Sequence, residues 1–211
     1  MSARSLPWPL LVVTDRHGSE RPLADTVTAC LTGGARWIWF RDRDMAEAER
    51  RRLGARLRDL TRSAGAVLTV GGDVDLAAEL EADGVHLSGA RLDRIGAARA
   101  RLGPGALIGL SAHSVAEVAR AGAEGADYAT LSPIFASASK PGYGPALGPD
   151  TIRAAAGTGL PVVALGGVSA EQAAECRSAG ATTLAVMGGP MRAADPEAEI
   201  RRLLKAWRDA A

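Results

Sequence analysis

The stretch Pro161-Val162-Val163-Ala164-Leu165-Gly166-Gly167-Val168 joins a short apolar run, rich in β-branched residues, to a pair of glycines. Such a run, bounded by turn residues, is typical of a strand that is buried on both faces of a parallel sheet. Further runs of the same kind occur at residues 10–14, 37–40, 66–70, 84–87, 106–110, 128–131 and 183–186. The runs are apolar throughout rather than alternating, so we expect a sheet covered on both faces.

Between these runs, apolar residues recur with the 3.6-residue period of amphipathic helices, and most of the periodic stretches end at glycine. The pattern is clearest at residues 45–64, 75–82, 115–123, 170–179 and 197–209. Strand and helix therefore alternate along the chain. This alternation predicts an α/β protein, a single (β/α)8 barrel of the TIM type over residues 1–211. An open, doubly wound sheet is the alternative.

Composition narrows the classes of partner. The chain is 47% hydrophobic but only 4% aromatic, which predicts an aliphatic core. Its net charge of +1, with both signs interspersed, argues against nucleic-acid binding. No apolar run approaches the ~18 residues of a membrane span, so we expect a cytoplasmic protein that does not bind membranes. Cys30 and Cys176 are expected to be buried, non-catalytic thiols. We also expect a homodimer.

The longest stretch without periodicity, residues 132–149, follows the sixth candidate strand. It reads SPIFASASKPGYGPALGP and carries one cation, Lys140. Barrel enzymes keep their chemistry in loops at the C-terminal ends of strands, so the stretch is interpreted as a lid over the substrate. A surface insertion is the alternative, but Ile134 and Phe135 should anchor its first turn.

Charged and aromatic residues cluster at the end of the second strand. Arg41 and Arg43 are two positions apart, share a face, and could converge on one phosphate or diphosphate. A solvated run of charges is the alternative. Trp39 lies near the same rim, where it forms a wall of a ligand pocket or fills the core.

Paired glycines follow both the seventh and the eighth strands. They are Gly166-Gly167 and Gly188-Gly189, each leading toward a helix. Glycines let backbone N–H groups approach phosphate oxygens, and barrels frequently bind a phosphate at these two loops. Tight turns that need a positive φ are the alternative explanation.

The histidines His17, His86 and His113 do not have the spacing of metal ligands. Each is interpretable as a structural histidine or as an acid/base. His113, just after the fifth strand, is the best placed for proton transfer.

Together these motifs resemble the superfamily of thiamine phosphate synthase and its relative, the thiazole tautomerase, from residue 10 to about residue 196. The motifs that carry the resemblance are, in chain order, Val13-Thr14-Asp15, Phe40-Arg41-Asp42-Arg43, Val74-Asp75-Leu76-Ala77, Ala82-Asp83-Gly84-Val85-His86-Leu87, Ser111-Ala112-His113-Ser114, Ala126-Asp127-Tyr128, Ser132-Pro133-Ile134-Phe135, Lys140, Ala164-Leu165-Gly166-Gly167-Val168 and Ala194-Asp195-Pro196.

The resemblance implies two groups of substrate-binding residues. A phosphate or diphosphate would lie near Arg41, Arg43 and Lys140. A thiazole phosphate would lie near Ser137, Ser139, Gly167, Met187 and Gly188. Ser111 is similar to a serine that contacts the pyrimidine substrate of the synthase.

The chain also departs from the synthase pattern. An Asn-Asp pair and a further Asp that bind the diphosphate and its Mg²⁺ are replaced by Gly71, Gly72 and Arg91. Asp73 and Asp93 are the nearest carboxylates that could take over. Trp39 replaces a glutamine that binds the pyrimidine.

These departures make the chain resemble the tautomerase branch more closely, although the tautomerase histidine aligns with Pro133. We therefore expect a thiazole tautomerase-like isomerase with His113, or else His86, as its proton-transfer residue. It would need no metal or cofactor. One alternative is a thiamine phosphate synthase that couples hydroxymethylpyrimidine diphosphate to thiazole phosphate, where Mg²⁺ could take part. The other is a non-catalytic binder of thiazole phosphate.

Overall fold

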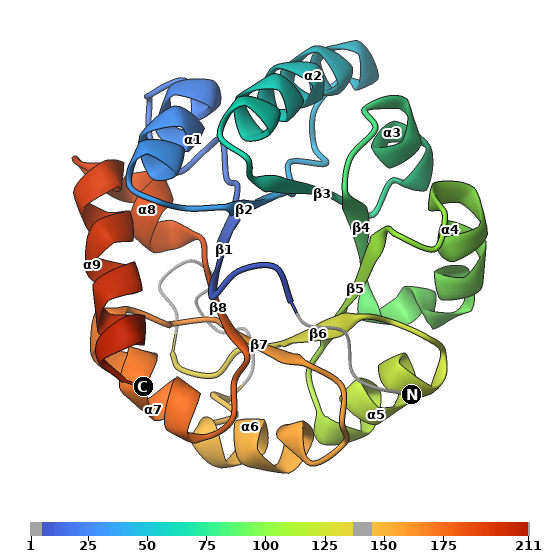
Figure 1. The fold of residues 1–211 in the computed structure, drawn as a ribbon, viewed down its shortest axis with the longest axis vertical. Helices are drawn as coiled ribbons and strands as arrows, with labels where there is room; N and C mark the ends of the chain where they lie inside the picture. Colours follow the sequence, from blue (N-terminus) through green and yellow to red (C-terminus); the bar gives the residue numbers. More distant parts are fainter. Residues whose placement is uncertain (1–5, 137–144, 211) are drawn as a thin grey trace.

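The computed structural model describes residues 6–136 and 145–210, and in it eight parallel strands close into a barrel (Figure 1). The strands follow one another around the barrel in chain order, and β1 closes it by pairing with β8. They are β1 Leu10–Val13, β2 Trp37–Phe40, β3 Val67–Gly71, β4 Gly84–Leu87, β5 Leu107–Ala112, β6 Tyr128–Leu131, β7 Val162–Leu165 and β8 Thr183–Val186. The predicted (β/α)8 barrel is confirmed, and the open sheet is excluded.

Helices form the outer ring and cover the barrel on all sides (Figure 1). They are α1 Leu23–Thr32, α2 Glu47–Ser63, α3 Val74–Glu79, α4 Ile95–Leu102, α5 Val115–Ala123, α6 Pro149–Ala156, α7 Ala173–Ser178, α8 Gly188–Arg192 and α9 Pro196–Asp209, with short 3-10 helices η1 Gly89–Arg94 and η2 Ala170–Gln172.

Two of the expected helices differ in extent for a reason that the structure shows. The stretch at 170–179 begins as η2, because Ser169 caps its first turn, and continues as α7. The helix expected at 75–82 begins one residue earlier, where Asp73 accepts a hydrogen bond from Leu76 N, and ends at Glu79.

Aromatic rings fill the inside of the barrel. Trp37 and Tyr128 meet edge to face, with ring centroids 4.9 Å apart. An ideal Cβ at Gly109 on β5 would lie 2.2 Å from the Tyr128 ring, so glycine is required there to make room for that ring. The barrel interior is thus a packed floor, and a substrate would bind above it, at the C-terminal ends of the strands.

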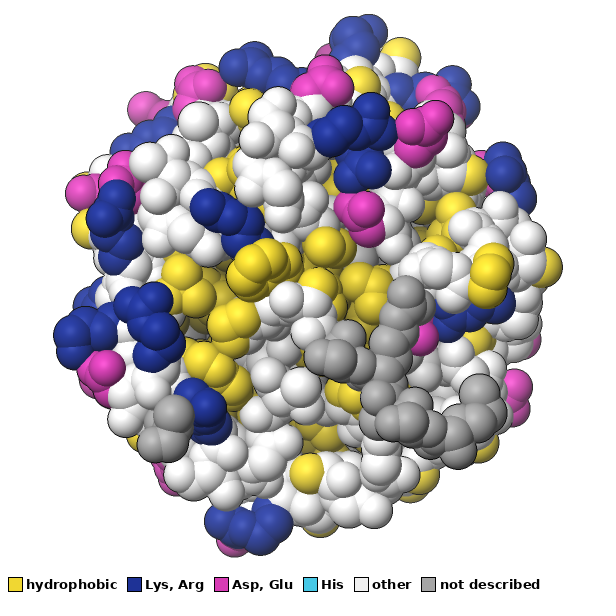
Figure 2. Space-filling model, in the orientation of Figure 1, with side chains coloured by type: hydrophobic (Ala, Val, Ile, Leu, Met, Phe, Trp, Pro, Cys, Tyr) yellow, Lys and Arg dark blue, Asp and Glu magenta, His cyan; other side chains and the backbone are white. Residues whose placement is uncertain are grey.

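The larger apolar core lies between the barrel and its helices. Cys30 and Cys176 are buried in it as free thiols, as expected, and burial raises the pKa of each to about 12. On the face shown in Figure 2, apolar side chains gather near the centre, while positive and negative side chains are interspersed around the periphery. Among the described residues, none of the helices has the length and apolar character needed to cross a membrane.

Candidate active site

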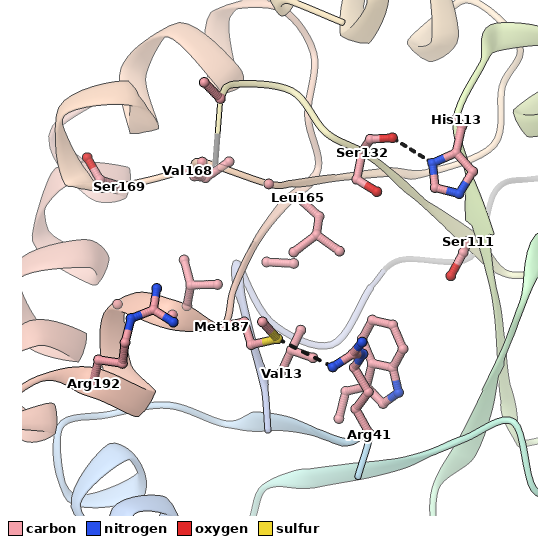
Figure 3. A pocket seen from close by; sticks show the side chains of 18 of the residues that line it. Val13, Arg41, Ser111, His113, Ser132, Leu165, Val168, Ser169, Met187 and Arg192 are labelled. Atoms are coloured by element: carbon pink, nitrogen blue, oxygen red, sulfur yellow. Dashed lines mark hydrogen bonds between the residues drawn. The ribbon is translucent and has the colours of Figure 1, made fainter. Parts of the chain in front are cut away.

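A cavity of about 550 Å³ opens above the aromatic floor, at the C-terminal ends of the strands. Its walls come from the loops after β2 and after β4 to β8, so it occupies the position where barrel enzymes bind their substrates. Figure 3 shows side chains from these loops pointing toward one space. Of the residues expected to bind substrate, it is lined by Trp39, Arg41, Arg43, Ser111, Gly167, Met187 and Gly188, and also by His113.

Arg41 and Arg43 both line the cavity, as their spacing predicts, while Asp42 between them is buried and points back into the barrel wall. Asp42 accepts hydrogen bonds from Thr14 Oγ1 and, at 2.7 Å, from Arg16 N. Thr14 Oγ1 in turn accepts a 2.9 Å bond from Arg41 N. This network ties the end of β2 to the end of β1 and fixes the backbone from which both arginines project.

Arg43 extends over the bare backbone of Gly72. An ideal Cβ at Gly72 would lie only 2.7 Å from Nη1 of Arg43, and Gly72 has a φ of +72°. Partial burial lowers the pKa of Arg43, and the positive charges of Arg41 and Arg50 lower it further. Cations are therefore concentrated at this rim, hereafter the β2 rim.

The glycines after β7 serve loop packing as well as access. Gly166 and Gly167 have φ values of +92° and +66°, and a Cβ at Gly167 would lie 2.4 Å from Ala136 O. Because this Cβ is absent, Ile134 and Phe135 can donate backbone hydrogen bonds to Leu165 O and Gly166 O. Ile134 is fully buried, so the first turn of the stretch at 132–149 is anchored as expected.

The opposite side of the cavity lies at the ends of β7 and β8, hereafter the β7–β8 rim. Gly188 and Gly189 begin α8, and the first N–H groups of a helix have no partner within it. Arg192 and Arg202 line the same side. In Figure 3, Met187 and Val13 lie between Arg192 and Arg41.

Sequence reasoning missed both of these arginines. Arg192 comes from α8, a short helix that no periodic pattern marks, and Arg202 reaches the cavity from α9. The only available signal was the position of Arg192 shortly after a strand-ending Gly-Gly pair.

Trp39 is both core and cavity wall. Its side chain is 4% exposed and lines the cavity, and its ring centroid is 3.9 Å from that of His86. Its buried Nε1 finds no hydrogen-bond partner among the described residues and faces Gly71, where an ideal Cβ would lie 2.9 Å away. The indole therefore occupies space that a side chain at position 71 would otherwise fill.

The structure does not bring His86 to the cavity surface. It is 1% exposed, and it hydrogen-bonds Tyr128 Oη at 3.1 Å and Ser111 Oγ at 3.0 Å. Burial lowers its pKa to about 3, with a smaller contribution from the charge of Arg43, so it is neutral near pH 7. A neutral imidazole below the cavity can position Ser111, which does line it, but cannot exchange a proton directly with a ligand there.

His113 lies at the cavity, at the end of β5. Its Nδ1 hydrogen-bonds Ser132 O at 2.7 Å (Figure 3), and because that oxygen can only accept, the proton resides on Nδ1. Ser114 caps α5 by accepting from Glu117 N. His113 is therefore the candidate histidine that lines the cavity, and its role in proton transfer stays a prediction.

The residues at the β3 and β4 ends do not fit a divalent metal ion. Gly71 and Gly72 carry no ligand atoms in their side chains, and Arg91 is a cation. Asp73 is already bound to Leu76 N and, at 2.8 Å, to Arg50, while the side chain of Asp93 is exposed and lies 3.9 Å from Arg91. Within residues 6–136 and 145–210, no cluster of three His, Cys, Asp or Glu is arranged to hold a metal. Asp73 is thus engaged by Arg50 and by the start of α3, and the described residues offer no ready carboxylate set in place of the missing ligands.

Three expected substrate-binding residues, Ser137, Ser139 and Lys140, lie outside the described residues. Their assignment stays a prediction.

Comparisons with known proteins agree on one family. The sequence profile described as thiamine monophosphate synthase matches residues 10–189. The chain is 39% identical to a thiamine-phosphate synthase of Roseiflexus sp. (strain RS-1), over 94% of this chain and 86% of that protein. It is 37% identical to the thiamine-phosphate synthase of Moorella thermoacetica, over 93% and 94%.

A solved structure, the thiamine phosphate pyrophosphorylase from Pyrococcus furiosus, superposes with a TM-score of 0.84 at 30% identity, covering 95% of this chain and 96% of that one. These relatives are named as synthases or pyrophosphorylases, not tautomerases. The comparisons thus bear out the superfamily but not the expected closeness to the tautomerase branch.

Proposed function

Because this chain belongs to the thiamine monophosphate synthase family, we propose that it couples hydroxymethylpyrimidine diphosphate to a thiazole phosphate and releases diphosphate. This reverses the order of our expectations from sequence, in which the tautomerase came first. The synthase assignment draws on the named relatives and on one feature of the cavity.

That feature is the presence of two separate places for anions in one cavity. The β2 rim presents the guanidinium groups of Arg41 and Arg43, and the β7–β8 rim presents glycine backbone and Arg192. Apolar side chains, Val13 and Met187 among them, lie between the two rims (Figure 3). A thiazole carboxylate phosphate carries its carboxylate and its phosphate on one small molecule, whereas a coupling reaction must hold a diphosphate and a phosphate on two separate molecules at once. Two rims therefore favour the two-substrate reaction.

The rims suggest how the chain's own residues would promote coupling. The bond between the pyrimidine's methylene carbon and diphosphate breaks, and that carbon forms a new bond to the thiazole nitrogen. Negative charge grows on the departing diphosphate, and Arg41 and Arg43 would stabilise it where it develops. The β7–β8 rim would hold the thiazole by its phosphate, so that the two reacting atoms meet over the apolar centre of the cavity.

Ser111 would orient the pyrimidine. Its Oγ is held by the buried His86, which is fixed in turn by Tyr128. Since His86 is neutral, it can accept the Ser111 hydroxyl proton in a hydrogen bond, which leaves the serine oxygen able to accept from a ligand.

A second candidate, tautomerisation of a thiazole carboxylate phosphate, is favoured by one observation. His113 lies at the cavity with its Nδ1 hydrogen-bonded to Ser132 O, so its proton position is defined. That is the arrangement expected of a proton-transfer residue.

Product analysis separates these candidates. Purified protein is incubated with hydroxymethylpyrimidine diphosphate and thiazole phosphate, together and singly, and with the non-aromatic thiazole isomer alone. We expect coupled product and one diphosphate per coupling event only when both substrates are present. Isomerisation of the thiazole without coupling would support the tautomerase instead, and no turnover in any mixture would leave a binding protein.

A further inference from the structure

The contact between Arg43 and Gly72 is made by the arginine side chain against a backbone that is held in place. Gly72 N donates a 2.8 Å hydrogen bond to His86 O, which fixes residue 72 against β4. An ideal Cβ at residue 72 would lie 2.7 Å from Nη1, 3.1 Å from Cζ and 3.4 Å from Cδ of Arg43. The guanidinium and its stem thus lie along the face of Gly72 where any other residue would carry its side chain.

Carboxylates close to this guanidinium are committed elsewhere. Asp73 caps α3 and pairs with the 7% exposed Arg50, which also donates to Asp42 O and Gly71 O. The Asp42 carboxylate accepts hydrogen bonds from Thr14 Oγ1 and Arg16 N, just after β1. In the part of the chain that the structure describes, no carboxylate forms an ion pair with Arg41 or Arg43. Within residues 6–136 and 145–210, the charges of these two arginines are therefore not neutralised by an ion pair.

This arrangement suits a diphosphate better than it suits a metal ion. A guanidinium offers N–H donors in a fixed plane that matches two phosphate oxygens, and pairs of this kind are strong. A divalent cation beside these arginines would be repelled by them. The aspartates that share a small pocket with Arg41 and Arg43 already accept hydrogen bonds from Thr14, Arg16 or His17; they are Asp15, Asp42 and Asp44.

We propose, on the basis of the proposed function, that Arg43 held over Gly72 replaces a divalent cation in binding the substrate's diphosphate, so that this subsite works without metal. Arg41 completes the subsite from the neighbouring position on the same rim. The substrate class at this rim is thus a metal-free organic diphosphate, and inorganic diphosphate is its simplest member.

Calorimetric titration with inorganic diphosphate tests the proposal without requiring turnover. The titration is run in excess EDTA and again in excess Mg²⁺. We expect binding in EDTA that Mg²⁺ does not strengthen. Arg43→Gln should weaken metal-free binding by about tenfold or more, the loss of one charge-assisted contact. The control Arg52→Gln removes an exposed arginine of α2 away from the cavity and should leave binding unchanged.

A matched pair at residue 72 tests the geometry. Gly72→Asn and Gly72→Asp put side chains of nearly equal size into the same positive-φ position, so both carry the same strain and crowding. Only the aspartate can pair with Arg43 and neutralise it. We expect Gly72→Asp to bind diphosphate in EDTA at least about fivefold more weakly than Gly72→Asn, since a charge-assisted contact to Arg43 is roughly twice as strong as a neutral one and competes with the diphosphate.

The proposal is overturned if the wild-type protein binds diphosphate only with Mg²⁺, or if Arg43→Gln binds as well as wild type in EDTA. Equal affinities for the two residue-72 variants would also overturn it. Failure of the proposed function looks different, because coupled product would then be missing while metal-free diphosphate binding through Arg43 persisted. Conversely, coupling that occurs only with Mg²⁺ would support the proposed function but contradict the metal-free diphosphate subsite.

Discussion

Burial of His86 makes the stability of the barrel depend on pH in a defined window. The imidazole is enclosed between Trp39, Tyr128 and Ser111, and its pKa falls from 6.5 to about 3. Above pH 6.5 the group is neutral in both folded and unfolded chains and contributes no pH dependence. Below pH 6.5 the unfolded chain binds a proton that the folded chain does not, so stability falls as the pH falls toward 3.

The size of this effect follows from the one proton that the unfolded chain binds and the folded chain does not. Each pH unit within the window changes the free energy of unfolding by about 1.4 kcal/mol per proton. Between pH 6.5 and pH 5.0, His86 should therefore remove about 2 kcal/mol of stability. That is a large share of the 5–15 kcal/mol that holds a typical domain together.

Urea unfolding at pH 7.5, 6.0 and 5.0 measures this contribution when wild type is compared with His86→Gln. The variant should be less stable at pH 7.5, because it loses buried hydrogen bonds, but its loss on acidification should be smaller by about 2 kcal/mol. His17→Gln, which removes an exposed imidazole, serves as the control and should follow wild type. If His86→Gln loses as much stability as wild type between pH 7.5 and 5.0, the reasoning about His86 is refuted.

Three further substitutions probe the cavity and its support. Arg41→Ala should weaken binding of phosphate ligands by about 1.5–3 kcal/mol in calorimetry, and an unchanged dissociation constant would remove Arg41 from the site. His113→Gln should keep coupled-product formation within about tenfold of wild type, whereas a fall of ~100-fold or more would show that His113 takes part in the coupling reaction itself. Gly167→Ala should cost about 2 kcal/mol or more of stability in thermal unfolding, because residue 167 has a φ of +66° and its Cβ would lie 2.4 Å from a carbonyl oxygen. Gly96→Ala, on α4 with open space around its Cβ, should cost nothing, and equal melting temperatures for the two variants would contradict this explanation.

The barrel could be predicted because every strand is buried on both faces. A run such as Val162–Leu165 stays apolar at each position, and each strand begins and ends within two residues of its expected run. The boundaries of short helices were less predictable. The turn that starts at Ser169 is tightened by its own capping hydrogen bonds, which a 3.6-residue pattern does not register.

The site was predictable where it depends on position along a strand. Arg41 and Arg43 follow β2 and share a face, so both reach the cavity. The contact of Arg43 with Gly72 was not predictable, because it depends on the β2–β3 register, in which Phe40 lies beside Val70. The register brings Arg43 beside Gly72, whose departure from the family pattern had suggested only the loss of a metal ligand.

Histidine roles were predictable only in part. His113 follows a strand and therefore lies at the rim, which is where position alone placed it. His86 lies within β4, and the apolar run around it does not show which side chains point into the barrel. Nor does it show that the His86 ring packs against Trp39. The stacking of Trp39 on His86 is a contact between neighbouring layers of the barrel interior, set by packing rather than by local sequence.

Simultaneous binding tests most directly whether one cavity holds two anionic substrates. Thiazole phosphate is titrated calorimetrically into the protein alone and into protein saturated with inorganic diphosphate in EDTA. With separate anion places at the β2 rim and the β7–β8 rim, thiazole phosphate should bind one per chain in both titrations, with affinities within about tenfold of each other. Loss of thiazole phosphate binding in proportion to the diphosphate present would show a single shared anion site and would contradict the two-substrate account.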